Sequence, residues 1–435
     1  MFGAPAVSSG TDANAWLAAM LEVERALAAA GAACGVIPES AAAAIQSAAD
    51  PARFDVASIA YDAAQSGTPV IALVRELTAA VPPDARPYVH FGATSQDIID
   101  TAASLIAYRC LGPVLDDVAE AADVCARLAA EHRDTILIGR TVMRHASPAT
   151  FGLVCAGWLT ALDDAYGRLD YIRRHRLAAQ LGGAAGTLAG LNLGVPAAFA
   201  ASLGLADPVL PWHTDRTRMA ELAGALGTLA GVLGKIAHDV LLHSQPEVGE
   251  LETAGADTAG SSAMPHKRNP VQAVAVTANS IRVPGLVATM LAAMVQEHQR
   301  AAGAWQAEWE TLTALLRATG GAAHHGRALV EGLTVNLERM RANVELSGGM
   351  AMSAAVADRL APVLGRTAAH DLIRRIATEA ARNGIGLGAA LRADSQVREV
   401  LTDADIDAAL NPANGLGLAA ELVDRAVAAH PRRAR

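Results

Sequence analysis

Aromatic residues and cysteines are scarce in this sequence. Phe, Tyr and Trp together make up only 3% of the 435 residues, and there are 4 cysteines. The cysteines stand far apart and form no CxxC pair: Cys34, Cys110, Cys125 and Cys155. This spacing argues against a disulfide framework or a zinc cluster and favours a reducing compartment.

Positive charge and long uncharged apolar runs are also limited. The net charge of −9 argues against a nucleic-acid partner, because phosphate binding needs a broad basic surface. The uncharged apolar run LAGALGTLAGVLG at 222–234 is shorter than the roughly 20 residues that span a bilayer. The N-terminal stretch MFGAPAVSSGTDANAW lacks the basic and apolar regions of a signal peptide. We therefore expect a soluble, cytoplasmic protein with no membrane partner.

Alanine and helical periodicity dominate what is present. Hydrophobic residues make up 52% of the chain, and many of them are alanine, the best helix former. Apolar residues recur at helical spacing, whereas strict alternation of apolar and polar residues is rare. The sequence therefore predicts an all-α fold in three helical domains: 1–105, a central helix bundle at 106–350, and 351–435.

Capping and breaking residues place the individual helices. Asp12 caps the first long helix. Further helices are predicted at these positions: 69–80, 95–111, 113–133, 214–245, 271–300 with a kink at Pro284, 304–325 and 336–345. The segment 135–145 is predicted to be an extended connection, after which Ser147 and Pro148 begin a helix to about His175.

Glycines recur at helical spacing within the segment 214–245, which contains no proline. They stand three and four residues apart, on one helical face: Gly224, Gly227, Gly231 and Gly234. Each glycine costs about 1 kcal/mol of helix propensity relative to alanine. Close contact with a neighbouring helix would offset that cost, so this helix is expected inside a helix bundle.

The stretch SSAMPHKRNP at 261–270 concentrates hydrogen-bond donors in an acidic chain. Pro270 suits the first position of the following helix, whose free N–H groups favour an anion. Lys267 and Asn269 add a positive charge and an amide donor at the same place. A polar loop that merely faces water is the alternative. The paired serines and the apolar helix that follows favour a site for an anionic small molecule.

Several blocks of the sequence resemble the fumarase/aspartase superfamily. GSSAMPHKRNP at 260–270 resembles its signature loop, GSSxMPxKxNP, which is a long and specific pattern. VHFGATSQDIIDTA at 89–102 and GRTVMRHASP at 139–148 resemble its first and second blocks. The resemblance continues in order across nearly the whole chain through the remaining blocks: LGGAAGTLAG, PWHTDRTRMAE, QEHQRAAGAWQAEW and RANVELSGGM.

The resemblance implies a homotetramer with a bundle core and with active sites built from three subunits. It also implies proton transfer at the carbon next to a carboxylate, while a bond at the neighbouring carbon breaks or forms. Negative charge then grows on that carboxylate, so the site needs hydrogen-bond donors placed in advance. No metal or organic cofactor is expected.

The resemblance assigns roles in the signature loop. Ser261 is expected to transfer the proton, activated by local donors and Lys267. The alternative is that Ser261 only binds a carboxylate. Lys267 and Asn269 are expected to hold the carboxylate that accepts charge, although Asn269 could equally cap the next helix.

The other predicted substrate contacts carry hydroxyl, imidazole or guanidinium groups: Thr94, Ser95, Thr141, His145, Arg218 and Arg300. Ser95 could also be the N-cap of the helix that follows it. His145 could be a donor, a proton shuttle or a structural residue. The two arginines suit a third carboxylate because a guanidinium binds it in a bidentate fork. His90 and His213 stay open between substrate binding and ordinary hydrogen bonding.

Two departures from the family pattern bear on the expected chemistry. Adenylosuccinate lyases and fumarases place a His directly after GRT and a partner Glu after the signature loop, where this sequence has Val142 and Val274. Valine cannot transfer protons, so the leaving group should depart as an anion. This pattern resembles the branch that closes 3-carboxy-cis,cis-muconate, a tricarboxylate, into a γ-lactone in protocatechuate breakdown.

Two alternatives stay open beside that cycloisomerase. One is a related lyase that releases an amine, nitrite or a similar group from a succinate-type substrate. The other is a non-catalytic structural relative, which would keep the fold without turnover.

Overall fold

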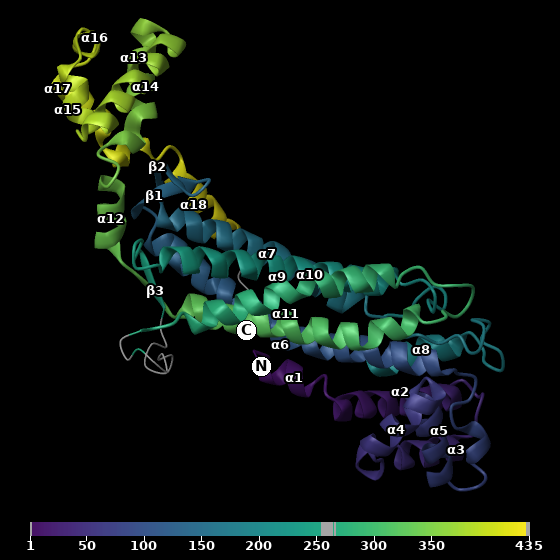
Figure 1. Cartoon of the computed structure of the whole chain (residues 1–435). Helices are drawn as coiled ribbons and strands as arrows, with labels where there is room; N and C mark the ends of the chain where they lie inside the picture. The colour runs from purple at the N-terminus through teal and green to yellow at the C-terminus, as the bar shows by residue number, and fades with distance from the viewer. Residues whose placement is uncertain (1, 254–263, 265–266, 432–435) are drawn as a thin grey trace. The chain divides into compact units, whose positions relative to one another are not determined.

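The computed structural model describes residues 2–253, 264 and 267–431. Within these ranges the regular structure is helical apart from two short antiparallel sheets of two strands each and isolated bridges (Figure 1). The all-α expectation is therefore confirmed.

The chain divides into two compact units, each assembled from separate segments. Unit 1 contains Met1–Val118, Asp164–Gly234 and Val274–Gly326. Unit 2 contains Ala119–Asp163, Lys235–Ala273 and Arg327–Arg435. The long helices contribute residues to both units, so neither unit is continuous in sequence. The division of the chain near residues 105 and 350 stays a prediction.

Some of the short helices of unit 1 begin at capping residues that the sequence displays. The short helices are α1 (Pro5–Ser9), α2 (Ala13–Ala33), α3 (Glu39–Ala48), α4 (Val56–Ser66), α5 (Pro69–Ala80) and α8 (Gly194–Leu203), with 3₁₀ turns at Pro51–Arg53 and Arg86–Tyr88. The Asp12 carboxylate accepts a hydrogen bond from the N–H of Ala15 at 2.8 Å and so caps α2, as predicted. Thr68 caps α5, and Pro69 occupies its first position, which confirms the predicted range.

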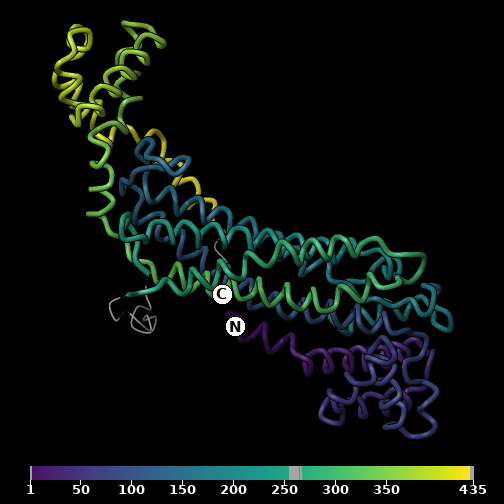
Figure 2. Tube along the Cα trace, viewed as in Figure 1, coloured from purple at the N-terminus to yellow at the C-terminus, as the bar shows by residue number. Residues whose placement is uncertain are grey.

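The long helices are traced in Figure 2: α6 (Ser95–Glu131), α7 (Phe151–His175), α9 (Thr217–His243), α10 (Val271–Ala292) and α11 (Ala304–Glu331). The predicted break between 111 and 113 is wrong, because α6 continues through Pro113. A proline inside a helix removes one backbone hydrogen bond. Leu111 and Val114 on either side are buried, and this burial offsets the loss.

The second sequence block forms a β-hairpin. Its two antiparallel strands are β1 (Ile136–Thr141) and β2 (Arg144–Thr150). Pro148 lies opposite Ile138 within the pairing, so Ser147 and Pro148 do not begin a helix as predicted. A proline is tolerated in a strand where its missing N–H is not needed by a partner. Helix α7 begins only at Phe151 and ends at His175, as predicted.

The glycines of α9 fall into two pairs. A Cβ on Gly227 or Gly234 would lie 3.0 or 3.1 Å from side chains of α10, so the two helices approach closely there. A Cβ on Gly224 or Gly231 would meet no atom of the described chain within 4 Å. Close packing therefore explains one pair, whereas the other pair faces open space.

Three described helices, α6, α9 and α10, are long and apolar enough to cross a membrane by length and composition alone. The apolar window of α6 is 78% buried inside the chain, whereas that of α10 is only 28% buried. Helix α10 therefore presents an apolar surface of the kind that a partner covers. The soluble, cytoplasmic character of the protein stays a prediction.

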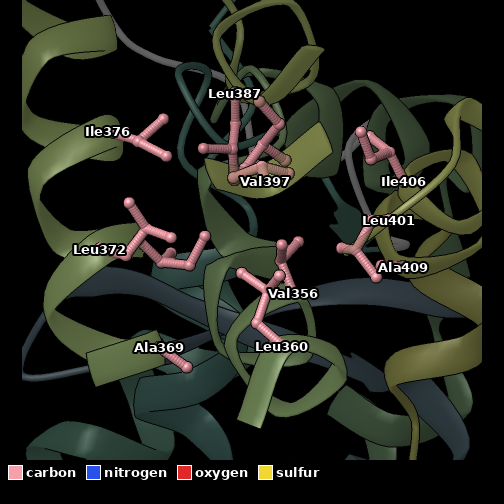
Figure 3. Close-up of a cluster of buried hydrophobic side chains, with 12 residues drawn as sticks. Val356, Leu360, Ala369, Leu372, Ile376, Leu387, Val397, Leu401, Ile406 and Ala409 are labelled. Atoms are coloured by element: carbon pink, nitrogen blue, oxygen red, sulfur yellow. The ribbon is translucent and has the colours of Figure 1, made fainter. Parts of the chain in front are cut away.

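Unit 2 carries the remaining elements: β3 (Leu251–Thr253), β4 (Leu333–Val335), α12 (Leu337–Glu345), α13 (Ser353–Leu364), α14 (Arg366–Asn383), α15 (Leu387–Ala393), α16 (Ser395–Arg398), α17 (Asp403–Leu410) and α18 (Ala419–Ala429), with 3₁₀ turns at Met350–Met352 and Pro412–Gly415. Side chains from α13 to α17, among them Val356, Leu372, Leu387 and Ile406, point toward one another (Figure 3). The residues after 350 therefore have a hydrophobic core of their own.

Candidate active site

The predicted site residues fall in both units. Unit 1 holds Thr94, Ser95, Arg218 and Arg300, and unit 2 holds Thr141, His145, Lys267 and Asn269. Ser261 lies outside the described residues.

Asp97 organises the start of α6 in unit 1. Its fully buried carboxylate accepts hydrogen bonds from the N–H of Thr94 at 3.0 Å and from the N–H groups of Gly182 and Gly183 at 3.1 and 2.9 Å. The Gln180 amide donates to it as well, at 3.0 Å. Burial raises the pKa of Asp97. The carboxylate thus holds the glycine-rich segment against the turn that presents Thr94 and Ser95.

Thr94 and Ser95 are half-buried at the first turn of α6. Ser95 is the first helical residue, so Thr94 directly precedes the helix. Asp97 stands three residues after Thr94 and accepts a hydrogen bond from its N–H, which is half of a capping box. Thr94 and Ser95 thus stand at a helix start, where a carboxylate is favoured.

Gln96 and Gln180 join two further blocks to this turn. The amide of Gln96 donates to the carbonyl of His213 at 2.6 Å, and the Gln180 side-chain oxygen accepts from the N–H of Trp212 at 2.7 Å. Gln96 also accepts a hydrogen bond from Arg300 at 2.8 Å. Four blocks that are far apart in the sequence therefore meet in unit 1: 94–97, 180–186, 211–216 and 296–300.

Arg300 lies half-buried within this cluster. Besides Gln96, its guanidinium donates to the carbonyls of Ala184, at 3.3 Å, and Gly183. Burial lowers its pKa, while Asp97 and Asp100 act against that shift. A guanidinium has five N–H groups. Three of them make these hydrogen bonds within the described chain, so Arg300 retains donors for a carboxylate.

A buried ion-pair cluster supports the same region and was not predicted from the sequence. Arg216 binds both Asp100 oxygens, at 2.7 and 3.0 Å, and its Nε donates to Glu308 at 3.0 Å. The Trp305 indole donates to Asp100 at 3.0 Å. These charges are almost wholly buried, so their pairing is required for the local structure.

The two histidines that the sequence left open differ in their surroundings. The His90 ring lies 2.6 Å from the buried Glu24 carboxylate, and although burial opposes it, Glu24 raises the pKa of His90. The His213 ring packs against Gly186, where an added Cβ would lie 2.4 Å from the ring. Burial and Arg300 lower the pKa of His213, so a neutral imidazole is favoured there.

Arg218 makes its contact away from this cluster. Its guanidinium donates to the carbonyl of Arg176 at 3.0 Å. Burial, with the neighbouring Arg176, lowers its pKa. Its role toward a carboxylate stays a prediction.

The hairpin of unit 2 presents Thr141 and His145 on exposed positions beside its tip. The tip residues Val142 and Met143 have φ values of 49° and 62°, in the left-handed region that β-branched and bulky residues avoid. Val142 is 96% exposed in the chain. Such strain is held where the surrounding structure or a function requires it.

The described end of the signature loop leads into α10. Lys267 is exposed, and its N–H donates to the carbonyl of Met264 at 3.1 Å. The carbonyl of Asn269 accepts from the N–H of Val271 at 2.9 Å. Helix α10 begins directly after Pro270, close to the predicted start. The roles of Lys267 and Asn269 stay predictions.

Comparison with known families decides the membership of the chain. Residues 5–285 match the family model described as lyase, and residues 349–426 match the model described as adenylosuccinate lyase C-terminus. The chain belongs to the fumarase/aspartase superfamily. This confirms the resemblance carried by the three sequence blocks.

The relatives within the superfamily carry different activities. The chain is 45% identical over 440 residues to the nitrosuccinate lyase of Streptomyces davaonensis, covering 98% of this chain and 92% of that protein. It is 44% identical to the 3-carboxy-cis,cis-muconate cycloisomerase of Pseudomonas aeruginosa, covering 95% and 92%. The crystal structure of the 3-carboxy-cis,cis-muconate lactonizing enzyme from Pseudomonas putida superposes with a TM-score of 0.91 at 40% identity, covering 99% and 97%.

Proposed function

We propose that this superfamily member cyclises 3-carboxy-cis,cis-muconate to its γ-lactone. Val142 carries the proposal: it is an apolar side chain where fumarases and adenylosuccinate lyases place a proton-transferring His. Because valine cannot protonate a leaving group, the reaction needs a leaving group that departs as a stable anion. The relatives that carry out this cyclisation support the substrate.

The ring closure takes up one proton, which comes from solvent through the proton-transfer group, and the carboxylate that leaves in the reverse direction needs no acid. In ring closure, a carboxylate oxygen of the substrate bonds to a diene carbon, and a proton adds to the carbon next to another carboxylate. In the reverse direction that C–O bond breaks and the carboxylate leaves with its electron pair. Ser261 is the proposed proton-transfer group. Thr94, Ser95 and Arg300 would hold substrate carboxylates through donors placed in advance.

Elimination of nitrite from nitrosuccinate is a second candidate, favoured by the relative of that name at 45% identity. A proton would leave the carbon next to one carboxylate, the C–N bond would break, and fumarate and nitrite would form. Nitrite is also a stable anion, so Val142 is compatible with this reaction. Both candidate reactions combine proton transfer next to a carboxylate with an anionic leaving group, and they differ in substrate.

Substrate turnover separates the candidates. Purified protein would be given 3-carboxy-cis,cis-muconate, nitrosuccinate, adenylosuccinate and argininosuccinate separately. Ring closure shortens the conjugated diene, so ultraviolet absorbance should fall with the first substrate. Nitrite release from the second alone would replace the cycloisomerase proposal. Turnover of adenylosuccinate or argininosuccinate alone would overturn the argument from Val142, because their amine and guanidine leaving groups need protonation. No turnover of any of the four substrates would favour a non-catalytic relative.

The role of Ser261 has its own test. Replacing Ser261 with Ala should reduce kcat by a factor of about 10³ or more, because proton transfer loses its donor and acceptor. The oligomeric state should not change. Near-normal turnover in this variant would remove Ser261 from the mechanism.

We also propose a homotetramer with active sites shared between subunits. The exposed apolar face of α10 supports a further copy as its partner, with Val274, Ile281 and Leu291 between 46% and 73% exposed. The exposed hairpin that bears Thr141 is consistent with a contribution to the site of another subunit.

A further inference from the structure

Glu250 is a fully buried carboxylate in unit 2 that no predicted role accounts for. Its side chain has no exposed surface, and it stands directly before β3, the strand that leads toward the signature loop. The two nitrogens at the end of the Arg140 guanidinium donate to its two oxygens at 2.9 and 2.8 Å. This bidentate pair is the geometry in which Arg and a carboxylate bind most strongly.

Two further side chains complete the shell of Glu250. The His243 ring lies 2.6 Å from Oε2, and the Asn343 amide donates to Oε1 at 2.8 Å. The hydrogen bonds from His243, Arg140 and Asn343 lower the pKa of Glu250 to about 2 against the effect of burial. The carboxylate is therefore ionised at any working pH.

The shell joins elements that are distant in the sequence. Arg140 belongs to β1, His243 is the last residue of α9, and Asn343 belongs to α12. The Glu250 backbone adds to the connection: its N–H donates to the carbonyl of His243 at 2.9 Å, and its carbonyl accepts from Asn336 at 3.0 Å. One residue thus holds β1, β3 and two helix ends in a single arrangement.

Arg140 is the neighbour of Thr141 in β1. Because consecutive side chains of a strand point to opposite faces, an Arg140 held by Glu250 sets the direction in which Thr141 points. Arg140 also pairs with His145 across the hairpin, so the position of Arg140 fixes that of His145 as well. The contact between Glu250 and Arg140 therefore orients Thr141 and His145, the two side chains of the hairpin predicted to meet the substrate.

We infer that Glu250 is a positioning residue, which acts through Arg140 to orient the substrate-contacting end of the β1–β2 hairpin relative to β3. This inference rests on the proposed function, because it takes Thr141 as a substrate contact. A misplacement of about 1 Å in such a group can cost about 10²-fold in rate. A purely structural Glu250 would instead affect stability without changing the kinetics of the folded enzyme.

Glu250→Gln tests the inference through two independent readouts. Hydrogen exchange followed by mass spectrometry should show a larger rise in exchange rate in both 136–150 and 251–253 than in the core at 356–409. With whichever substrate the wild type turns over, kcat/KM should fall 10-fold to 100-fold, mostly in kcat. Wild-type exchange in the hairpin, or unchanged kcat/KM despite faster exchange, would overturn the inference.

Matched variants cover the other outcomes. If Glu250→Gln does not fold, Arg140→Lys keeps the charge but loses the bidentate fork, and should give the same pattern more weakly. Asp163→Asn removes another unit 2 carboxylate, 2.8 Å from His430 and outside this shell, and should leave hairpin exchange and kcat unchanged. If the wild type turns over no tested substrate, the proposed function fails, but the exchange data still decide whether Glu250 holds the hairpin.

Discussion

At the scale of single residues, two buried carboxylates behave in opposite ways. Glu250 and Asp97 both have no exposed surface, and burial alone would raise the pKa of each. Glu250 faces the cationic Arg140, and its hydrogen bonds lower its pKa to about 2. Asp97 is bound by neutral N–H groups, which do not offset burial, so its pKa is raised. The hydrogen bonds outweigh burial at Glu250, whereas at Asp97 burial outweighs the hydrogen bonds and the nearby Arg300.

The depressed pKa of Glu250 predicts a pH dependence of stability. A carboxylate whose pKa is lowered on folding stabilises the native state above its ordinary pKa, 4.5, and loses that contribution as pH falls toward 2. Glu250→Gln should therefore lower the free energy of unfolding at pH 7 by about 3 kcal/mol. Denaturant unfolding between pH 7 and pH 3 should show this difference shrinking below about pH 4.5. A difference that stays constant down to pH 3 would contradict the argument.

Asp97→Asn should destabilise the protein because an amide has only one acceptor oxygen. Oδ2 of Asp97 accepts from Thr94 and Gly183, and an NH₂ group in its place would leave both N–H groups unpaired. We expect a loss of about 2 kcal/mol or more in the free energy of unfolding, with a lower kcat/KM. Asp55→Asn is the control: Asp55 caps α4 at an exposed position, where Asn serves equally well. Equal stability of the two variants would contradict the role of Asp97.

At the scale of elements, the hairpin tip is under backbone strain. Val142 and Val209 are 96% and 98% exposed, but only Val142 has a positive φ. Replacing either by Gly raises the entropy of the unfolded chain equally, whereas only Val142→Gly relieves strain of about 1–2 kcal/mol. Val142→Gly should therefore be more stable than Val209→Gly by about that amount in denaturant unfolding. The opposite order would show that the tip is not strained or that its side chain is held by a partner.

At the scale of the whole molecule, the uncovered surface of α10 predicts self-association. Ile281 on this helix is 73% exposed in the single chain, and a charge there would be buried unpaired if another copy covers it. Ile281→Asp should therefore reduce the molar mass measured by light scattering from that of a tetramer to that of smaller species. Val363→Asp changes a 68% exposed residue of α13 and should leave the mass unchanged. A monomeric wild type would remove the tetramer from the proposal.

The sequence was sufficient to predict local structure where a capping side chain and the N–H group that it binds lie within a turn or two of helix. Asp12 and Thr68 satisfy N–H groups two or three residues away, so the starts of α2 and α5 could be predicted. The motif blocks indicated the superfamily because long patterns rarely arise by chance. They also placed candidate site residues in the first turn of α6 and beside the hairpin tip.

The sequence by itself determined the helical class, the starts of α2, α5 and α6, and the family. Only the tertiary structure decided that α6 continues through Pro113, that Pro148 lies in a strand, and that Asp97 and Glu250 organise two separate groups of predicted site residues. The donors to Asp97 at Gly182 and Gly183 lie 85 and 86 residues away in sequence, and Arg140 lies 110 residues from Glu250. Local signals act over a few residues, whereas the burial that stabilises a proline in a helix and the partners that hold a buried charge come from distant segments.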